Sequence, residues 1–297
     1  MAVFRSIAEL LKITEEKGKP LSDVVWMWES ERSECPAQTI WDEMSLRLKI
    51  MKEAVETGLR NKAKSSSGLI GGDARRLFNS HSLMGEVAGR AAAYALAVSE
   101  VNASMGKIVA CPTAGSCGIV PGALLASADY LGCSENTLIR ALFTAGGIGE
   151  VVDRTATVSG AVGGCQAECG TAAAMAAAAV VEIMGGSPRQ SAEAAALSLK
   201  NMLGLVCDPV AGLVEVPCVK RNAFAAVHAL LAADMALAGI ESVIPADEVI
   251  QAMHKIGIEM PVSLKETSAC GLATTPTASA IAERLFRDRN NEEKNQT

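Results

Sequence analysis

The residues best suited to chemistry in this sequence are the closely spaced thiols of "GGCQAECG", residues 163–170. Cys165 and Cys169 stand four residues apart between glycines, and one carboxylate, Glu168, lies between them. Residues four apart share a helix face, so the two thiols should be neighbours if the segment is helical. The pair is either part of a metal site or two small buried side chains.

A second pair of thiols, Cys207 and Cys218, flanks the loop "DPVAGLVEVP". Its prolines stiffen the loop, which could return one thiol toward the other. Thiolates that are distant in sequence can together hold an iron–sulfur cluster. Spacing alone leaves metal binding and buried free thiols equally open. The sequence contains no CxxC, so neither a zinc ribbon nor a thioredoxin motif is indicated.

The elements that must position these thiols are predicted to be helices. Apolar residues make up 49% of the 297 residues but aromatic residues only 3%, so small aliphatic side chains form the core and favour close helix packing. The net charge is −6 and no basic cluster stands out, which argues against a nucleic-acid surface. Cys35, Cys133 and Cys270 are expected to be packing residues.

Local signals mark several helix ends. Ser187, Pro188 and Gln190 form a capping box with proline at the first helical position. Two further helices are expected to close at Gly58, in "MSLRLKIMKEAVETG", and at Gly257, in "IPADEVIQAMHKIG". Alternating strand patterns are few. We therefore expect a mostly α fold, a compact helical domain with Gly- and Pro-rich loops gathered around the site.

The expected organisation is an N-terminal helical segment at 1–60, a catalytic domain at 61–288 and a disordered tail at 289–297. The N-terminus lacks the apolar core of a signal peptide. The most apolar runs, 171–186 and 223–239, contain charged residues, among them Glu182 and Asp234, and indicate buried helices rather than membrane spans. The protein is expected to be cytoplasmic.

Longer motifs carry a resemblance to a known family. The segment from "GAVGGCQAECGTAAAMAAAA" to "GLVCDPVAGLVEVPCVKRNA" is similar to the alpha chain of the iron–sulfur L-serine dehydratases, as are "EVNASMGKIVACPTAGSCGIVPG" and "LKETSACGLATTPT". The resemblance extends from about residue 65 to about residue 280. It implies a pyridoxal-phosphate-independent lyase that uses a 4Fe-4S cluster to eliminate water from L-serine, giving pyruvate and ammonia.

The resemblance also implies a ligand set. The family's three cluster cysteines fall on Cys165, Cys207 and Cys218, whereas the position of Cys169 is often not a cysteine. Three thiolates leave one iron open as a Lewis acid for the substrate hydroxyl. A fourth thiolate would block that position, so Cys169 is expected to be a packing residue or a donor near the cluster; a regulatory closing ligand is the alternative.

Substrate-binding candidates lie in two glycine-rich loops. "CPTAGSCG" offers backbone N–H groups, including that of Gly115, and the hydroxyls of Thr113 and Ser116 for the substrate carboxylate. In "GGDA", Asp73 could bind the ammonium group, but an ordinary helix cap is the alternative. Both loops would otherwise simply begin helices.

The general base is expected to be Lys265, with His81 and Glu266 also considered. The family has a beta domain, on the same or a separate chain, with a Ser-Ser-His-Thr run that this sequence lacks. The base could therefore come from a partner chain, and an oligomer is expected.

Three other functions compete with this interpretation. A pyridoxal-phosphate lyase would need a Schiff-base lysine, for which Lys200 and Lys265 are the candidates, but its strand–helix alternation is not visible. A related cluster lyase could act on cysteine or another hydroxy or thio amino acid. A closed four-ligand site would instead favour a non-catalytic iron–sulfur or zinc subunit. The segment "AGGIGEVVDR" lacks the third glycine of a dinucleotide-binding motif.

Overall fold

The computed structural model describes residues 4–60, 64–65 and 67–295. Within these residues the secondary structure is helical apart from one isolated bridge between Cys207 and Lys265, which confirms the mostly α prediction. The helices are α1 (Ile7–Lys17), α2 (Leu21–Ser33), α3 (Ala37–Arg60), α4 (Asp73–Phe78), α5 (Gly85–Ala103), α6 (Ile119–Leu131), α7 (Glu135–Thr155), α8 (Gly160–Gly163), α9 (Thr171–Ile183), α10 (Pro188–Lys200), α11 (Cys218–Leu237), α12 (Ala246–Glu259) and α13 (Pro276–Asn295).

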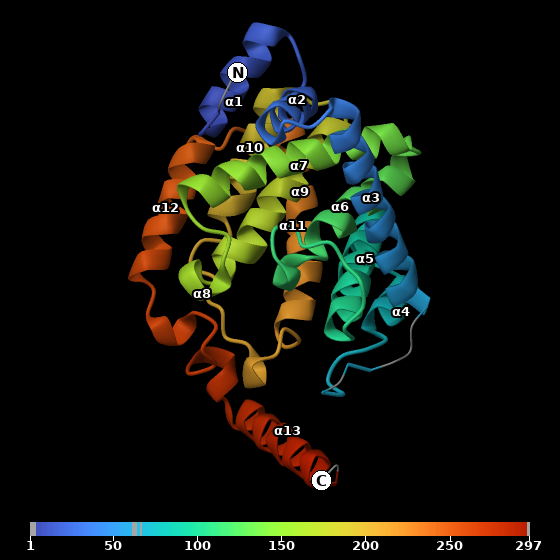
Figure 1. Cartoon of the computed structure of the whole chain (residues 1–297), viewed down its shortest axis with the longest axis vertical. Helices are drawn as coiled ribbons and strands as arrows, with labels where there is room; N and C mark the ends of the chain where they lie inside the picture. Colours follow the sequence, from blue (N-terminus) through green and yellow to red (C-terminus); the bar gives the residue numbers. More distant parts are fainter. Residues whose placement is uncertain (1–3, 61–63, 66, 296–297) are drawn as a thin grey trace.

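Helix α9 forms the centre of the molecule. Its sequence, "TAAAMAAAAVVEI", is buried from Thr171 through Val181. Helices α6, α7, α10 and α11 all pack against it (Figure 1). Alanine side chains let neighbouring backbones approach closely, so a helix that is apolar on every face can be enclosed by four others.

The remaining helices form an outer layer. Helix α5 packs on α6 and α11, α3 packs on α5, and α2 packs on α7. Helices α1 and α12 cover α10. Helix α13 contacts the body through its N-terminal end and projects away from it, at the opposite end of the molecule from α1 (Figure 1).

The structure supports some of the predicted helix ends and changes others. Helix α10 begins with the expected capping box, in which Ser187 accepts from Gln190 N and the Gln190 side chain accepts from Ser187 N. Helix α3 does not end at Gly58, nor α12 at Gly257; both glycines lie inside the last helical turns. These two predictions were wrong because each glycine allows a neighbouring backbone to pack closely against the helix and does not end it.

Close backbone contact explains the glycine in α3. A Cβ atom on Gly58 would lie 2.2 Å from the carbonyl oxygen of Ala97 in α5. In α6, a Cβ on Gly122 would lie 2.8 Å from the carbonyl oxygen of Ala91, also in α5. Helix α5 is therefore held between two helices that each approach it through a glycine.

The predicted division at residue 60 stays a prediction. The polar connection that follows it lies partly outside the described residues. Helix α13 continues to Asn295, into the segment expected to be a disordered tail, and residues 296–297 lie outside the described part. Among the described helices, none combines the length and the hydropathy needed to cross a membrane.

We predict that Gly58→Ala lowers the free energy of unfolding by about 1–3 kcal/mol, because the new methyl group forces α3 away from α5. Urea unfolding followed by circular dichroism measures the change. Gly146→Ala is the matched control, since a Cβ at this position in α7 meets no atom within 4 Å. The control should be neutral or stabilising by up to about 1 kcal/mol. Equal stability of the two variants would contradict the packing role of Gly58.

Candidate metal centre

The first two thiols lie where α8 gives way to α9. Residues Gln166–Gly170 form a π-helical turn directly before α9. π-helical turns are rare and occur frequently at functional sites. The turn places the sulfur of Cys165 3.8 Å from that of Cys169, which confirms that the two thiols are neighbours.

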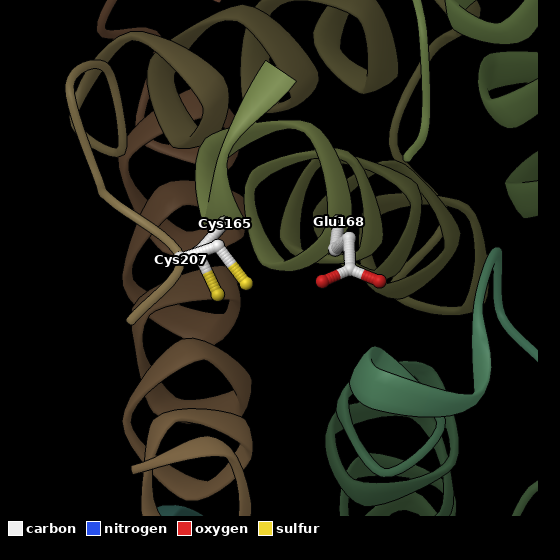
Figure 2. A group of neighbouring side chains, drawn as sticks. All are labelled: Cys165, Glu168 and Cys207. Carbon is white, nitrogen blue, oxygen red and sulfur yellow. The ribbon is translucent and has the colours of Figure 1, made fainter. Parts of the chain in front are cut away.

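The thiol of Cys207 joins Cys165 from a distant part of the sequence. The backbone of Cys207 is fixed on both sides, because its N–H donates to Leu264 O at 2.8 Å and its carbonyl accepts from Glu266 N at 2.7 Å. The Sγ atoms of Cys165 and Cys207 and a carboxylate oxygen of Glu168 all lie within 4.8 Å of one another. Figure 2 shows the two thiols and the carboxylate pointing in the same direction. A metal ion could bind this set of donors.

Cys218, the first residue of α11, lies outside that closest set but interacts with it. Burial, followed by the charge of Cys165, raises the pKa of the Cys218 thiol to about 12. Hydrogen bonding with the Cys169 and Cys207 thiols lowers the pKa of Cys165, and the positive charge of Arg221 acts in the same direction. The pKa values of Cys169 and Cys207 are raised in turn by the hydrogen bond with Cys165. Cys165 is therefore the thiol that most readily becomes a thiolate.

Arg221 is the cation of this site, and Asp208 is its partner. The Arg221 guanidinium donates to Asp208 Oδ1 and to Val206 O, both at 2.8 Å. Side-chain exposure is 17% for Arg221 and 4% for Asp208, so the pair is largely removed from water. The other oxygen of Asp208 accepts from Leu272 N at 2.7 Å. One ion pair thus joins α11, the Cys207 segment and the loop before α13.

Glu168 is a partly buried carboxylate, and within the described part of the chain its one hydrogen-bond donor is the hydroxyl of Thr113 at 2.8 Å. Burial raises the pKa of Glu168 to about 7, and the charges of Cys165 and Glu266 also raise it, while the Thr113 hydrogen bond opposes the shift. A Cβ on Gly160 would lie 2.5 Å from Glu168 Oε2 and 3.3 Å from Cys207 Sγ. Glycine at position 160 therefore lets the backbone pack against the carboxylate and the thiol without a clash.

Two buried amides tie the site segments together, and sequence reasoning missed both. Gln166 Nε2 donates to Gly163 O at 2.9 Å and to Met253 O at 3.0 Å, while its Oε1 accepts from Gly204 N at 2.9 Å. Asn222 Nδ2 donates to Gly115 O at 2.7 Å and to Cys218 O at 3.0 Å, and its Oδ1 accepts from Gly118 N. Each amide also bonds to residues far away in the sequence, so no local pattern could have identified these links.

The predicted substrate loop lies beside the π-helical turn. Thr113 contacts Glu168 directly, and a Cβ on Gly115 would lie 3.3 Å from Glu168 Oε1. Ser116 is fully buried, and its hydroxyl donates to Cys111 O at 3.2 Å within the loop. Asp73 is not brought to this set by any described contact; its carboxylate pairs with Lys220 at 2.9 Å and with Arg76.

The candidate bases lie in different places. The backbone of Lys265 bridges to Cys207, which places the Lys265 loop at the site. His81 lines a separate surface pocket of about 360 Å³ with Phe78 and Arg90. Lys200, the other Schiff-base candidate, donates to Ser242 O at 2.8 Å.

The matching family model is that of the serine dehydratase alpha chain, and it covers residues 16–273. The chain belongs to this family. The resemblance found in the motifs around Cys165, Cys207 and Cys218 is thereby confirmed.

Several curated relatives carry the same name. A probable L-serine dehydratase alpha chain from Bacillus subtilis is 54% identical over 288 residues, which is 96% of each chain. The L-serine dehydratase alpha chain of Peptoniphilus asaccharolyticus is 40% identical over 94% of this chain and 97% of its own length. L-serine dehydratase 1 of Escherichia coli is 46% identical over 61% of this chain, but the match covers only 40% of that longer protein.

The residues of the site fit the iron–sulfur cluster that the family resemblance implies. Cys165, Cys207 and Cys218 are buried thiols, and thiolates are the soft donors that hold such clusters. A nearby, partly buried cation, Arg221, offsets their negative charge.

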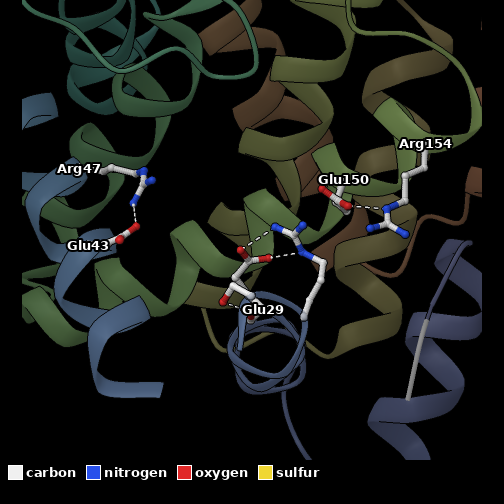
Figure 3. A network of polar contacts seen from close by, with 7 residues as sticks. Glu29, Glu43, Arg47, Glu150 and Arg154 are labelled. Carbon is white, nitrogen blue, oxygen red and sulfur yellow. Dashed lines mark hydrogen bonds and ion pairs between the residues drawn. The ribbon is translucent and has the colours of Figure 1, made fainter. Parts of the chain in front are cut away.

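We predict that Arg221→Gln lowers the free energy of unfolding by about 3 kcal/mol, because it leaves the buried Asp208 carboxylate without its cation. The measurement is urea unfolding of the iron-free chain. The control is Arg47→Gln, which breaks the exposed Arg47–Glu43 pair on α3, shown with the surface pair Glu150–Arg154 in Figure 3. That change should stay within about 0.5 kcal/mol. Similar losses in the two variants would refute a structural role for the buried pair.

Proposed function

We propose that this chain is the catalytic alpha chain of an iron–sulfur L-serine dehydratase. The reaction is the β-elimination of water from L-serine, followed by tautomerisation of the enamine and hydrolysis of the imine to pyruvate and ammonia. One observation carries the proposal: the thiols of Cys165 and Cys207, far apart in sequence, converge with the Glu168 carboxylate within 4.8 Å. The names of the relatives support the substrate.

The proposed ligands of a 4Fe-4S cluster are Cys165, Cys207 and Cys218. A cluster held by three thiolates supplies a Lewis acid that helps the substrate hydroxyl to leave. Arg221 stabilises the negative charge of the ligand set, and Cys165 is the thiol whose lowered pKa favours the ligating form. Cys169 is assigned a packing role, because a fourth thiolate would occupy the position that the substrate needs.

The proposed site for the substrate carboxylate is the loop around Thr113, Gly115 and Ser116. The loop contacts the π-helical turn, so a substrate held there would lie next to the cysteines. Binding of the carboxylate matters for the chemistry because its negative charge opposes the charge that develops at Cα. Asp73 remains a prediction for the ammonium group, although two cations already pair with its carboxylate.

The proposed base for the Cα proton is Lys265, whose segment is paired with Cys207. A base from a beta chain is the alternative. The relatives named alpha chains imply such a partner, and we propose that the active protein is an assembly of alpha and beta chains in the cytoplasm. L-serine is the proposed substrate; cysteine and other hydroxy amino acids serve as comparison substrates.

We predict that the chain, purified without oxygen and combined with a beta chain, contains iron and sulfide and forms pyruvate from L-serine. Cys165→Ala, Cys207→Ala and Cys218→Ala should each lose the cluster and the activity. Cys169→Ala should keep both, and so should the control Cys133→Ala, which changes a half-buried thiol just before α7. Iron content, visible absorption and pyruvate formation are the measurements.

Three results would contradict the proposal. Full cluster content in any one of the first three variants would refute that ligand. An absorption band typical of a lysine–pyridoxal aldimine would refute the cofactor. Full activity after chelation of all iron would refute the metal chemistry.

A further inference from the structure

We propose that Glu168 binds the α-ammonium group of the amino-acid substrate and so determines that the enzyme acts on amino acids. This inference rests on the proposed function. It assigns to Glu168 the role for which the sequence offered Asp73.

Among the described residues, Glu168, Glu182 and Glu215 accept from hydroxyl groups and have no cation within ion-pair distance. Of these three carboxylates, Glu168 is the one that lies beside the cysteine thiols. Asp208 pairs with Arg221, and Glu100 accepts three backbone N–H groups at the start of α4. Among the described residues, Glu168 has no cation within ion-pair distance and only the Thr113 hydroxyl as a donor. A partly buried carboxylate left in this state favours an incoming cation.

The backbone packs closely against both oxygens of Glu168. The position that a Cβ on Gly160 would occupy lies 2.5 Å from Glu168 Oε2 and 3.3 Å from Cys207 Sγ. A Cβ on Gly115 would lie 3.3 Å from the other carboxylate oxygen, Glu168 Oε1. Glycine at both positions therefore lets the backbone lie this close to the carboxylate, which fixes Glu168 beside the thiols.

The position of Glu168 beside the thiols agrees with this role. In serine the amino and hydroxyl groups are on adjacent carbons, so a group that binds the ammonium must lie close to the metal that activates the hydroxyl. Glu168 and the thiols of Cys165 and Cys207 lie within 4.8 Å of one another. Thr113, on the loop proposed for the substrate carboxylate, holds Glu168 Oε1 and leaves Oε2 for the ammonium.

The test compares two ligands on the complex of the alpha and beta chains with its cluster in place. L-serine and 3-hydroxypropanoate share the hydroxyl and carboxylate, but only L-serine carries an ammonium group. Each is titrated while the visible absorption of the cluster is followed. In Glu168→Gln the dissociation constant of L-serine should rise by about 10- to 100-fold, as for a lost charged hydrogen bond. That of 3-hydroxypropanoate should change less than about twofold.

Two further variants complete the design. Glu168→Asp keeps the charge and should retain part of the preference for L-serine, which keeps the test open if Glu168→Gln folds poorly. Glu43→Gln makes the same change on the exposed face of α3 and should leave both affinities unchanged.

Other outcomes would overturn the assignment. An equal loss of affinity for both ligands would show that the carboxylate does not recognise the ammonium. Loss of iron from Glu168→Gln before any ligand is added would make Glu168 a metal ligand. Unchanged L-serine affinity with reduced turnover would make it an acid or base. A wild-type complex with a cluster but no L-serine binding or turnover would overturn the proposed function as well.

Discussion

The burial of α9 is the constraint on which the rest of the structure depends. A helix whose side chains are mostly alanine must be covered on every face, and it can be covered only by helices that come very close. Four helices do so, and in the outer layer α5 packs closely on α6 at Gly122 and on α3 at Gly58. Because α9 cannot shift within this packing, the π-helical turn at its N-terminus has a fixed position. The positions of Cys165 and Glu168 are fixed with it, because Cys165 directly precedes this turn and Glu168 lies within it.

The site then depends on the distribution of charge in a region with little water. Asp208 and Arg221 compensate each other, and Arg221 also lies close enough to favour the thiolate of Cys165. Glu168 is left with a hydroxyl as its only described donor, and burial raises its pKa. The same surroundings thus hold one carboxylate in a structural ion pair and leave another available to a ligand. This difference separates residues that build the site from those that would meet a substrate.

Local parts of this structure were predictable from the sequence, and long-range parts were not. The capping box at Ser187 and the neighbouring thiols of Cys165 and Cys169 follow from residues three or four apart, and both were correctly predicted. Gly58 was misread as a helix end because its reason lies in Ala97, on another helix. The environment of Glu168 depends on Thr113, which no periodicity connects to it. Family resemblance supplied the proposed ligand set, which spacing had left open.

The pairing of Cys207 with the segment 264–266 has a consequence for how the protein is made. Both backbone hydrogen bonds that fix Cys207 come from residues synthesised nearly sixty positions later. Because chains are made from the N-terminus, Cys165 leaves the ribosome well before residues 264–266 have been synthesised. These are the residues that fix the backbone of Cys207. A complete set of thiols can therefore form only when almost the whole chain has been released. Completion of the site would then follow synthesis of these segments rather than accompany it.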